Sequence, residues 1–182
     1  MHDKILFLDI DGVLNSDEYC PYSTEYLTKC RNSFNPKNVK EKGLRNKIKS
    51  FYELTSNKMI EFLNKITDET GCKIVLSTSW RLHYYNVILD YKSYIGITGE
   101  IIDRTPEIKT QYGMPKLSER GREINLWLKR NPTEKYIILD DNPHGDCYFT
   151  ENQIPYLIET DGKIGLTLDD TVNAIRILNA KD

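Results

Sequence analysis

The chain has 182 residues, of which 39% are hydrophobic and 29% charged, and its formal net charge is -2 at pH 7. This length suffices for one domain with a full core, and the composition is typical of a soluble globular protein rather than one that coats nucleic acid. No apolar run approaches the ~20 residues of a membrane span, and the N-terminus lacks the pattern of a signal peptide. We therefore expect a cytoplasmic protein, a monomer or weak dimer, without membrane association.

Short apolar runs predict four buried strands. In chain order these runs are Ile5–Leu8, Ile74–Leu76, Tyr136–Leu139 and Tyr156–Ile158. Helical patterns rather than hairpin turns separate the strands, which indicates right-handed crossovers in a parallel sheet covered on both faces. The predicted fold is therefore α/β, a Rossmann-like three-layer α/β/α sandwich around a central parallel sheet, with residues 1–182 as a single domain.

The first predicted helix spans Thr55–Thr70. Its apolar face consists of Met59, Ile60, Leu63 and Ile66. Thr55 or Ser56 is a suitable N-cap, and Gly71 follows the helix at the position where a left-handed C-cap residue is common.

Two further helices are predicted in the C-terminal part of the chain. One begins near Ser118 and ends at Asn131-Pro132, and the other begins near Leu168 with Thr167 or Asp169 as its cap. The side chains expected to face the core are Ile124, Trp127 and Leu128 in the first of these helices, and Val172, Ile175 and Leu178 in the second.

Polar side chains directly follow three of the predicted strands. In chain order they are Asp9 and Asp11, which Gly12 follows, then Ser77 and Thr78, then Asp140 and Asp141. Ligands of open parallel sheets bind beyond the carboxyl ends of the strands, so we expect these side chains to converge. Each piece alone has a structural interpretation, such as an Asp-Gly turn or a helix start, but their occurrence at successive strand ends favours a functional site.

Four aspartates in one crevice would repel one another strongly. A hard divalent cation with oxygen ligands removes that conflict, and Mg²⁺ held by a few carboxylates and a substrate phosphate is the usual solution. Arg120 and Arg122, at the start of the helix that precedes the third strand, supply positive charge for the same region. The sequence therefore predicts a magnesium site at this edge of the sheet.

Four segments together resemble a known family. In this order, FLDIDGVL, VLSTSW, SERGREI and IILDDN are similar to the four motifs of the haloacid dehalogenase (HAD) superfamily of phosphohydrolases, from residue 4 to about residue 145. The segments IVLSTSWR and RGREI…WL, with GLT in the tail, further resemble the small HAD domains of RNA-repair proteins. The resemblance implies a HAD-like fold and a Mg²⁺-dependent phosphatase that works through an aspartyl-phosphate.

By this resemblance, Asp9 is the nucleophile that attacks the phosphoryl group. Asp11 protonates the leaving oxygen and then deprotonates the attacking water, and its backbone carbonyl faces the metal. An acid on the leaving oxygen is needed for ester cleavage and not for carbon–halogen cleavage, so a phosphatase is favoured over a dehalogenase. Ser77 donates a hydrogen bond to a phosphoryl oxygen, with Thr78 as the alternative.

The resemblance also implies a cation that stabilises the charge on the transferring group. Arg120 matches the position best, although family members commonly use lysine, and Lys116 and Arg122 are the alternatives. Gly12 leaves room for the phosphate. The metal ligands implied are Asp9, Asp11, Asp140 and Asp141.

An insertion at residues 15–54 is expected to form a small flap or minimal cap. Its stretch from Lys29 to Lys49 contains eight Lys or Arg and one Glu, a local charge of +7 in a chain of net -2. Nearby aromatic residues that could stack on bases are Tyr19, Tyr22, Tyr26 and Phe34. This stretch is either a solvated loop or a surface that attracts polyanions such as nucleotides, polynucleotide ends or phosphoproteins. A catalytically silent HAD-fold module that binds polyanions or nucleic acid is the alternative function.

The remaining candidates have structural interpretations. Trp80 is expected to pack and Arg81 to form a surface salt bridge, while His83 and His144 are isolated histidines without a partner. The four cysteines have no CxxC spacing, which favours reduced thiols over scattered disulfides. They are Cys20, Cys30, Cys72 and Cys147.

Overall fold

A computed structural model describes residues 4–16, 55–108, 119–142 and 149–180. Within these residues the chain forms a five-stranded sheet in the order β3-β2-β1-β4-β5, in which all neighbouring strands are parallel. The strands are β1 Lys4–Leu8, β2 Lys73–Leu76, β3 Ile101–Arg104, β4 Lys135–Asp140 and β5 Leu157–Glu159. The strand order reverses at the central strand β1, the position where open α/β sheets bind ligands.

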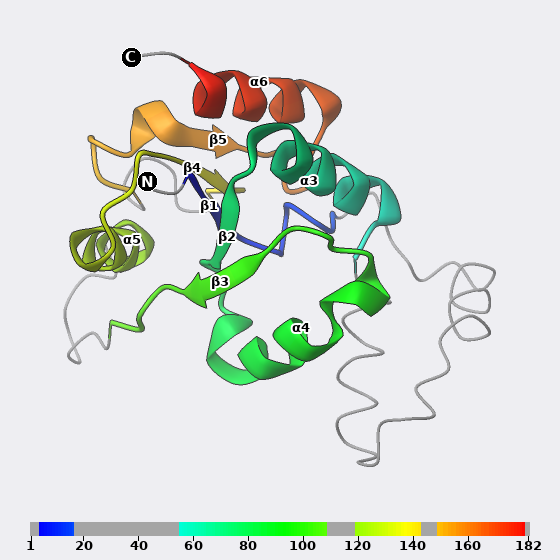
Figure 1. Cartoon of the computed structure of the whole chain (residues 1–182), viewed down its shortest axis with the longest axis horizontal. Helices are drawn as coiled ribbons and strands as arrows, with labels where there is room; N and C mark the ends of the chain where they lie inside the picture. The colour runs from blue at the N-terminus through cyan, green and yellow to red at the C-terminus, as the bar shows by residue number, and fades with distance from the viewer. Residues whose placement is uncertain (1–3, 17–54, 109–118, 143–148, 181–182) are drawn as a thin grey trace.

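Helices cover both faces of the sheet. The α-helices of the described chain are α3 Asn57–Thr70, α4 Arg81–Ile95, α5 Glu119–Arg130 and α6 Leu168–Asn179, and a 3₁₀ turn, η2, spans Ile154–Tyr156. Helices α3 and α6 lie beside each other over one face, and α5 lies on the other (Figure 1). This confirms the predicted Rossmann-like α/β/α architecture. None of these helices is long and apolar enough to cross a membrane.

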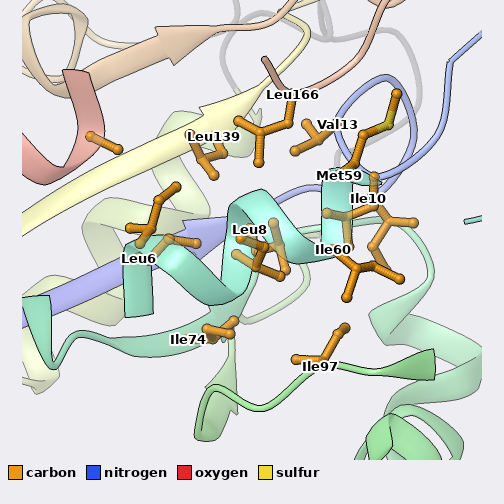
Figure 2. Close-up of a cluster of buried hydrophobic side chains, with 14 of the residues drawn as sticks. Leu6, Leu8, Ile10, Val13, Met59, Ile60, Ile74, Ile97, Leu139 and Leu166 are labelled. Carbon is orange, nitrogen blue, oxygen red and sulfur yellow. The ribbon is translucent and has the colours of Figure 1, made fainter. Parts of the chain in front are cut away.

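The alternation of side chains along β1 divides the core between the two faces. Leu6 and Leu8 point to the face covered by α3, where they pack in the cluster that Figure 2 shows. Ile5 and Phe7 point to the opposite face, where the Phe7 ring meets Trp127 of α5 edge-to-face at 5.4 Å between centroids. Both faces of β1 are therefore buried, which is why it reads as an uninterrupted apolar run.

The four predicted strands and three predicted helices are present, with shifts of a residue or two at their ends. Ser56 is the N-cap of α3, and Gly71 ends that helix in the left-handed conformation with φ of 68°. Strand β3 and helix α4 were not predicted. The second half of β3 is polar, and the apolar side chains of α4 do not recur with one clear helical period, so neither shows the pattern that local prediction relies on.

The inward face of α6 differs from the prediction. Thr167 caps the helix with a reciprocal capping box to Asp170, but Val172 is 54% exposed. The buried residues of α6 are Thr171, Ala174 and Leu178. Helix α6 packs against α3, and Ala174 and Leu178 join the buried cluster that contains Leu63 of α3, which leaves Val172 on the solvent side of the helix. The expectation that Val172 faces the core is therefore wrong.

Cys72 is buried and free among the described residues, and the prediction of reduced thiols for the four cysteines stays a prediction. The other three cysteines, the 17–54 part of the insertion, Lys116 and His144 lie outside the described residues. The flap prediction and the basic stretch consequently remain predictions.

Candidate active site

The carboxyl ends of β1, β2 and β4 hold the polar side chains side by side. The Asp9 N–H donates to Leu139 O at 2.9 Å, and the Ser77 N–H donates to Leu8 O at 2.8 Å. The parallel hydrogen-bond ladder therefore continues one residue past β1 and β2. This register places Asp9 between Ser77 and the Asp140 at the end of β4.

Three carboxylates form a compact cluster. Asp9, Asp140 and Asp141 each offer an oxygen, and these oxygens all lie within 4.8 Å of one another. Asp9 is 6% exposed and Asp140 is fully buried. Burial raises the pKa of Asp140 to about 7 against the attraction of Arg120, and the negative charge of Asp9 adds to the increase; burial and then the charge of Asp9 also raise the pKa of Asp141. The Oδ2 atom of Asp140 accepts no hydrogen bond within the described residues. A buried, over-charged set of oxygen donors fits a hard divalent cation such as Mg²⁺.

Arg120 partly neutralises this cluster. The side chain comes from the first turn of α5, and its guanidinium lies 3.2 Å from Asp9 Oδ2 and 3.7 Å from Asp140 Oδ2. The attraction of Arg120 opposes the effect of burial on Asp140, and does not cancel it. Of the three basic candidates, Arg120 is buried at the site, Arg122 is exposed on α5, and Lys116 is not among the described residues.

Gly12 is needed where it stands. Its φ is +71°, and a Cβ there would lie 2.5 Å from Asp141 Oδ2. The Gly12 carbonyl accepts a hydrogen bond from Thr160 Oγ1 at 2.7 Å, which ties the turn after β1 to the loop after β5. A side chain at position 12 would therefore displace Asp141 from the cluster.

The two hydroxyl candidates differ in their surroundings. Ser77 is 1% exposed, and its hydroxyl forms no hydrogen bond in the part of the chain that the structure describes. Thr78 Oγ1, in contrast, accepts the N–H of Trp80 at 3.3 Å and so caps the turn that leads into α4. A buried hydroxyl without a partner is costly unless a ligand satisfies it, which favours Ser77 as the phosphoryl-binding hydroxyl.

The Asp11 side chain lies apart from the three-carboxylate cluster. It is exposed, and it accepts hydrogen bonds from Trp80 Nε1 at 2.8 Å and from Asn15 Nδ2 at 3.0 Å. The side chain between the two aspartates, Ile10, is 1% exposed and belongs to the hydrophobic core. Asp9 and Asp11 therefore point to different surroundings, as separate roles require.

Sequence reasoning missed the residues that hold this site in place. Asn15 carried no signal, and Trp80 was expected only to pack. Arg81 was expected in a surface salt bridge, but it is 3% exposed and its guanidinium lies 2.5 Å from Glu123 of α5. That expectation is wrong because the Arg81 side chain, at the start of α4, reaches the buried Glu123 of α5, 42 residues away in the chain. His83 is exposed on α4.

One comparison with known proteins identifies the domain. The family described as "HAD domain in Swiss Army Knife RNA repair proteins" matches residues 5–171. The chain belongs to this HAD family. The match includes residues of all five strands and reaches the first turn of α6. Comparisons with curated proteins and with solved structures give no match.

The raised pKa of Asp140 predicts how the metal-free HAD domain responds to pH. Between the usual 3.8 and about 7, the folded chain keeps a proton that the unfolded chain has released. This stabilising contribution is complete below pH 3.8 and is lost as the pH rises through about 7. We expect the melting temperature in EDTA to fall across this window, and Asp140→Asn to flatten the fall. The exposed Asp90→Asn on α4 is the control, and an unchanged slope in Asp140→Asn would contradict the assignment.

Proposed function

We propose that this domain is a Mg²⁺-dependent phosphatase that hydrolyses a phosphate monoester through an aspartyl-phosphate, with nucleotide or polynucleotide ends as substrates. The observation that carries the proposal is the buried Asp9 carboxylate, which lies 3.2 Å from the Arg120 guanidinium and one strand from Ser77, whose hydroxyl has no hydrogen-bond partner among the described residues. Arg120 and Ser77 are the groups that a phosphoryl oxygen requires beside the nucleophile.

The reaction divides between the two aspartates. An oxygen of Asp9 attacks phosphorus, the P–O bond to the leaving group breaks, and Asp11 gives its proton to the leaving oxygen. Asp11 then takes a proton from water, which attacks the aspartyl-phosphate, releases inorganic phosphate and restores Asp9. Ser77 donates a hydrogen bond to the phosphoryl group, and Arg120 stabilises its negative charge.

Asp9, Asp140 and Asp141, with the backbone carbonyl of Asp11, would hold the metal. The bound Mg²⁺ supplies positive charge that offsets the carboxylates and the phosphoryl oxygens. The carboxylate cluster fits this assignment because its burial leaves the aspartates poorly solvated and mutually repelling.

Two observations support nucleic-acid ends as the substrate. The family is described as a domain of RNA-repair proteins. The stretch from Lys29 to Lys49, outside the described residues, carries a local charge of +7, and such charge attracts polyanions. Phosphopeptides and small metabolites are the competing substrates that an assay should include.

The test is hydrolysis with and without Mg²⁺. The substrates are a generic aryl phosphate, mononucleotides, 3′- and 5′-phosphorylated oligonucleotides and phosphopeptides. We expect Mg²⁺-dependent release of phosphate, fastest from the nucleotide or oligonucleotide substrates. Binding of oligonucleotide without any hydrolysis would instead indicate the silent polyanion-binding module.

Metal binding has its own prediction. Because Mg²⁺ binds the folded cluster and not the unfolded chain, it should raise the free energy of unfolding by about 2.7 kcal/mol at a hundredfold excess over its Kd. The melting temperature should rise accordingly. Asp141→Ala removes a ligand and should abolish most of this increase. Asp68→Ala, an exposed aspartate in the last turn of α3, is the control. An undiminished response in Asp141→Ala would show that the metal binds elsewhere.

A further inference from the structure

Trp80 is hydrogen-bonded to Asp11, the residue that the proposed reaction places at the leaving group. Its indole Nε1–H donates to Asp11 Oδ2 at 2.8 Å, while Asn15 holds the other carboxylate oxygen at 3.0 Å. In the proposed reaction Asp11 must reach the leaving oxygen. The atoms that follow that oxygen therefore leave the site past the Trp80 indole.

Two further rings continue from Trp80 along the start of α4. The ring of Tyr84, one helical turn on, lies 5.5 Å from Trp80 between centroids, and His83 lies 6.4 Å from Tyr84. We call Trp80, Tyr84 and His83 the aromatic row. Trp80 and Tyr84 are half-buried and packed against the core, whereas His83 is exposed. The row thus begins at Asp11 and ends in solvent on a rigid element.

The row suits a leaving group that carries a flat ring. Arg81, the one cation within the row's span of sequence, is buried against Glu123 and cannot contact a second phosphate there. Recognition at the row therefore depends on stacking, which tolerates any base because every base has a π-face. A ring bonded directly to the ester oxygen, as in a phosphotyrosine, would lie at Asp11 itself. The row continues beyond the indole that contacts Asp11 to Tyr84 and His83, so it suits a ring that a linker such as a sugar separates from the ester oxygen.

We propose that the aromatic row is the leaving-group subsite, and that it takes the terminal nucleobase of a phosphorylated nucleotide or oligonucleotide. This inference rests on the proposed phosphatase function and specifies its substrate class. In this proposal the Trp80 side chain has two roles. The indole N–H positions Asp11, and the indole ring contacts the base.

The test compares substrates that differ only in the terminal base. Oligonucleotides with a 5′- or a 3′-phosphate are made with either a normal or an abasic terminal nucleotide, and kcat/KM is measured for each with Mg²⁺. Wild type should prefer the base-bearing end by at least about fivefold, the lower limit of a single stacking contact. Trp80→Leu and His83→Ala should each reduce this preference. Trp80→Phe keeps a ring but loses the N–H, so it should slow both substrates and retain the preference.

The control is Tyr85→Leu. Tyr85 lies on the same helix, but its ring is covered by the guanidinium of Arg104 at 4.7 Å, so the preference should not change. Because His83 is exposed, His83→Ala should fold normally. It therefore tests the subsite even if Trp80→Leu does not fold. A wild-type preference near one, a preference unaltered in both variants, or faster hydrolysis of a phosphotyrosine peptide would overturn the subsite. Absence of hydrolysis of every ester, aryl phosphate included, would instead overturn the phosphatase function.

Discussion

Asp9→Asn is expected to reduce phosphatase turnover on the order of 10⁴-fold or more while the domain remains folded. The amide oxygen is a poor nucleophile and cannot form the acyl-phosphate. The substitution keeps the side-chain shape and an acceptor for the Ile10 N–H, which donates to Asp9 Oδ1 at 2.7 Å. It also removes one negative charge from a buried cluster of three, so stability without metal should not decrease.

The measurement is phosphate release with Mg²⁺ at saturating substrate, with the melting temperature as a check of folding. Asp90→Asn, an exposed aspartate on α4, controls for a general loss of charge. In wild type, a substrate that reacts quickly should leave a phosphorylated chain after an acid quench, and Asp9→Asn should leave none. Turnover close to wild type in a folded Asp9→Asn variant would rule out Asp9 as the nucleophile.

Arg81→Met is expected to cost about 3–5 kcal/mol of unfolding free energy, because it leaves the Glu123 carboxylate buried without its cation. Glu123 is 6% exposed, and burial raises its pKa even though Arg81 opposes the shift. Arg81 Nε also donates to the Thr105 carbonyl at 3.0 Å, so its loss removes this donor where β3 ends, whereas the Thr78 carbonyl keeps the backbone N–H of residue 81. The expected fall in melting temperature is on the order of 10 °C.

A double-mutant cycle isolates the ion pair. Arg81→Met combined with Glu123→Leu should recover part of the lost stability, since no charge is then left buried. The matched control is Glu69→Gln, which breaks the exposed Lys65–Glu69 ion pair on α3. The charged atoms of this pair are 3.6 Å apart, and the pair should contribute less than about 1 kcal/mol to the free energy of unfolding. If Arg81→Met costs no more than Glu69→Gln, the buried pair does not hold α4 and α5 together.

The helices and strands that the local sequence pattern predicted are those in which each face is either buried or exposed along its whole length. Strand β1 is buried on both faces and bounded by polar residues, and α3 has one apolar face between Ser56 and Gly71, so each is evident from its own sequence. Helix α4 packs against the core through the buried Ile88 and Ile95 and the half-buried Tyr84 and Tyr85, and its apolar residues do not recur with one helical period. The prediction that Val172 faces the core was wrong for the same reason. The packing of α6 against α3, rather than the local sequence pattern, determines which residues of α6 are buried.

By itself the sequence determined the order of the four motifs along the chain, the family resemblance, the carboxylates and hydroxyls at the strand ends and the guanidinium groups at the helix start. Chain order and period-2 burial suffice for this, because parallel strands place their carboxyl ends at one edge of a sheet. Only the tertiary structure decided that Arg120 lies at Asp9, that Trp80 bonds to Asp11 across 69 residues, and that Arg81 is buried. Such contacts join side chains from different elements. Their distances depend on register and helix placement, which no local stretch of sequence encodes.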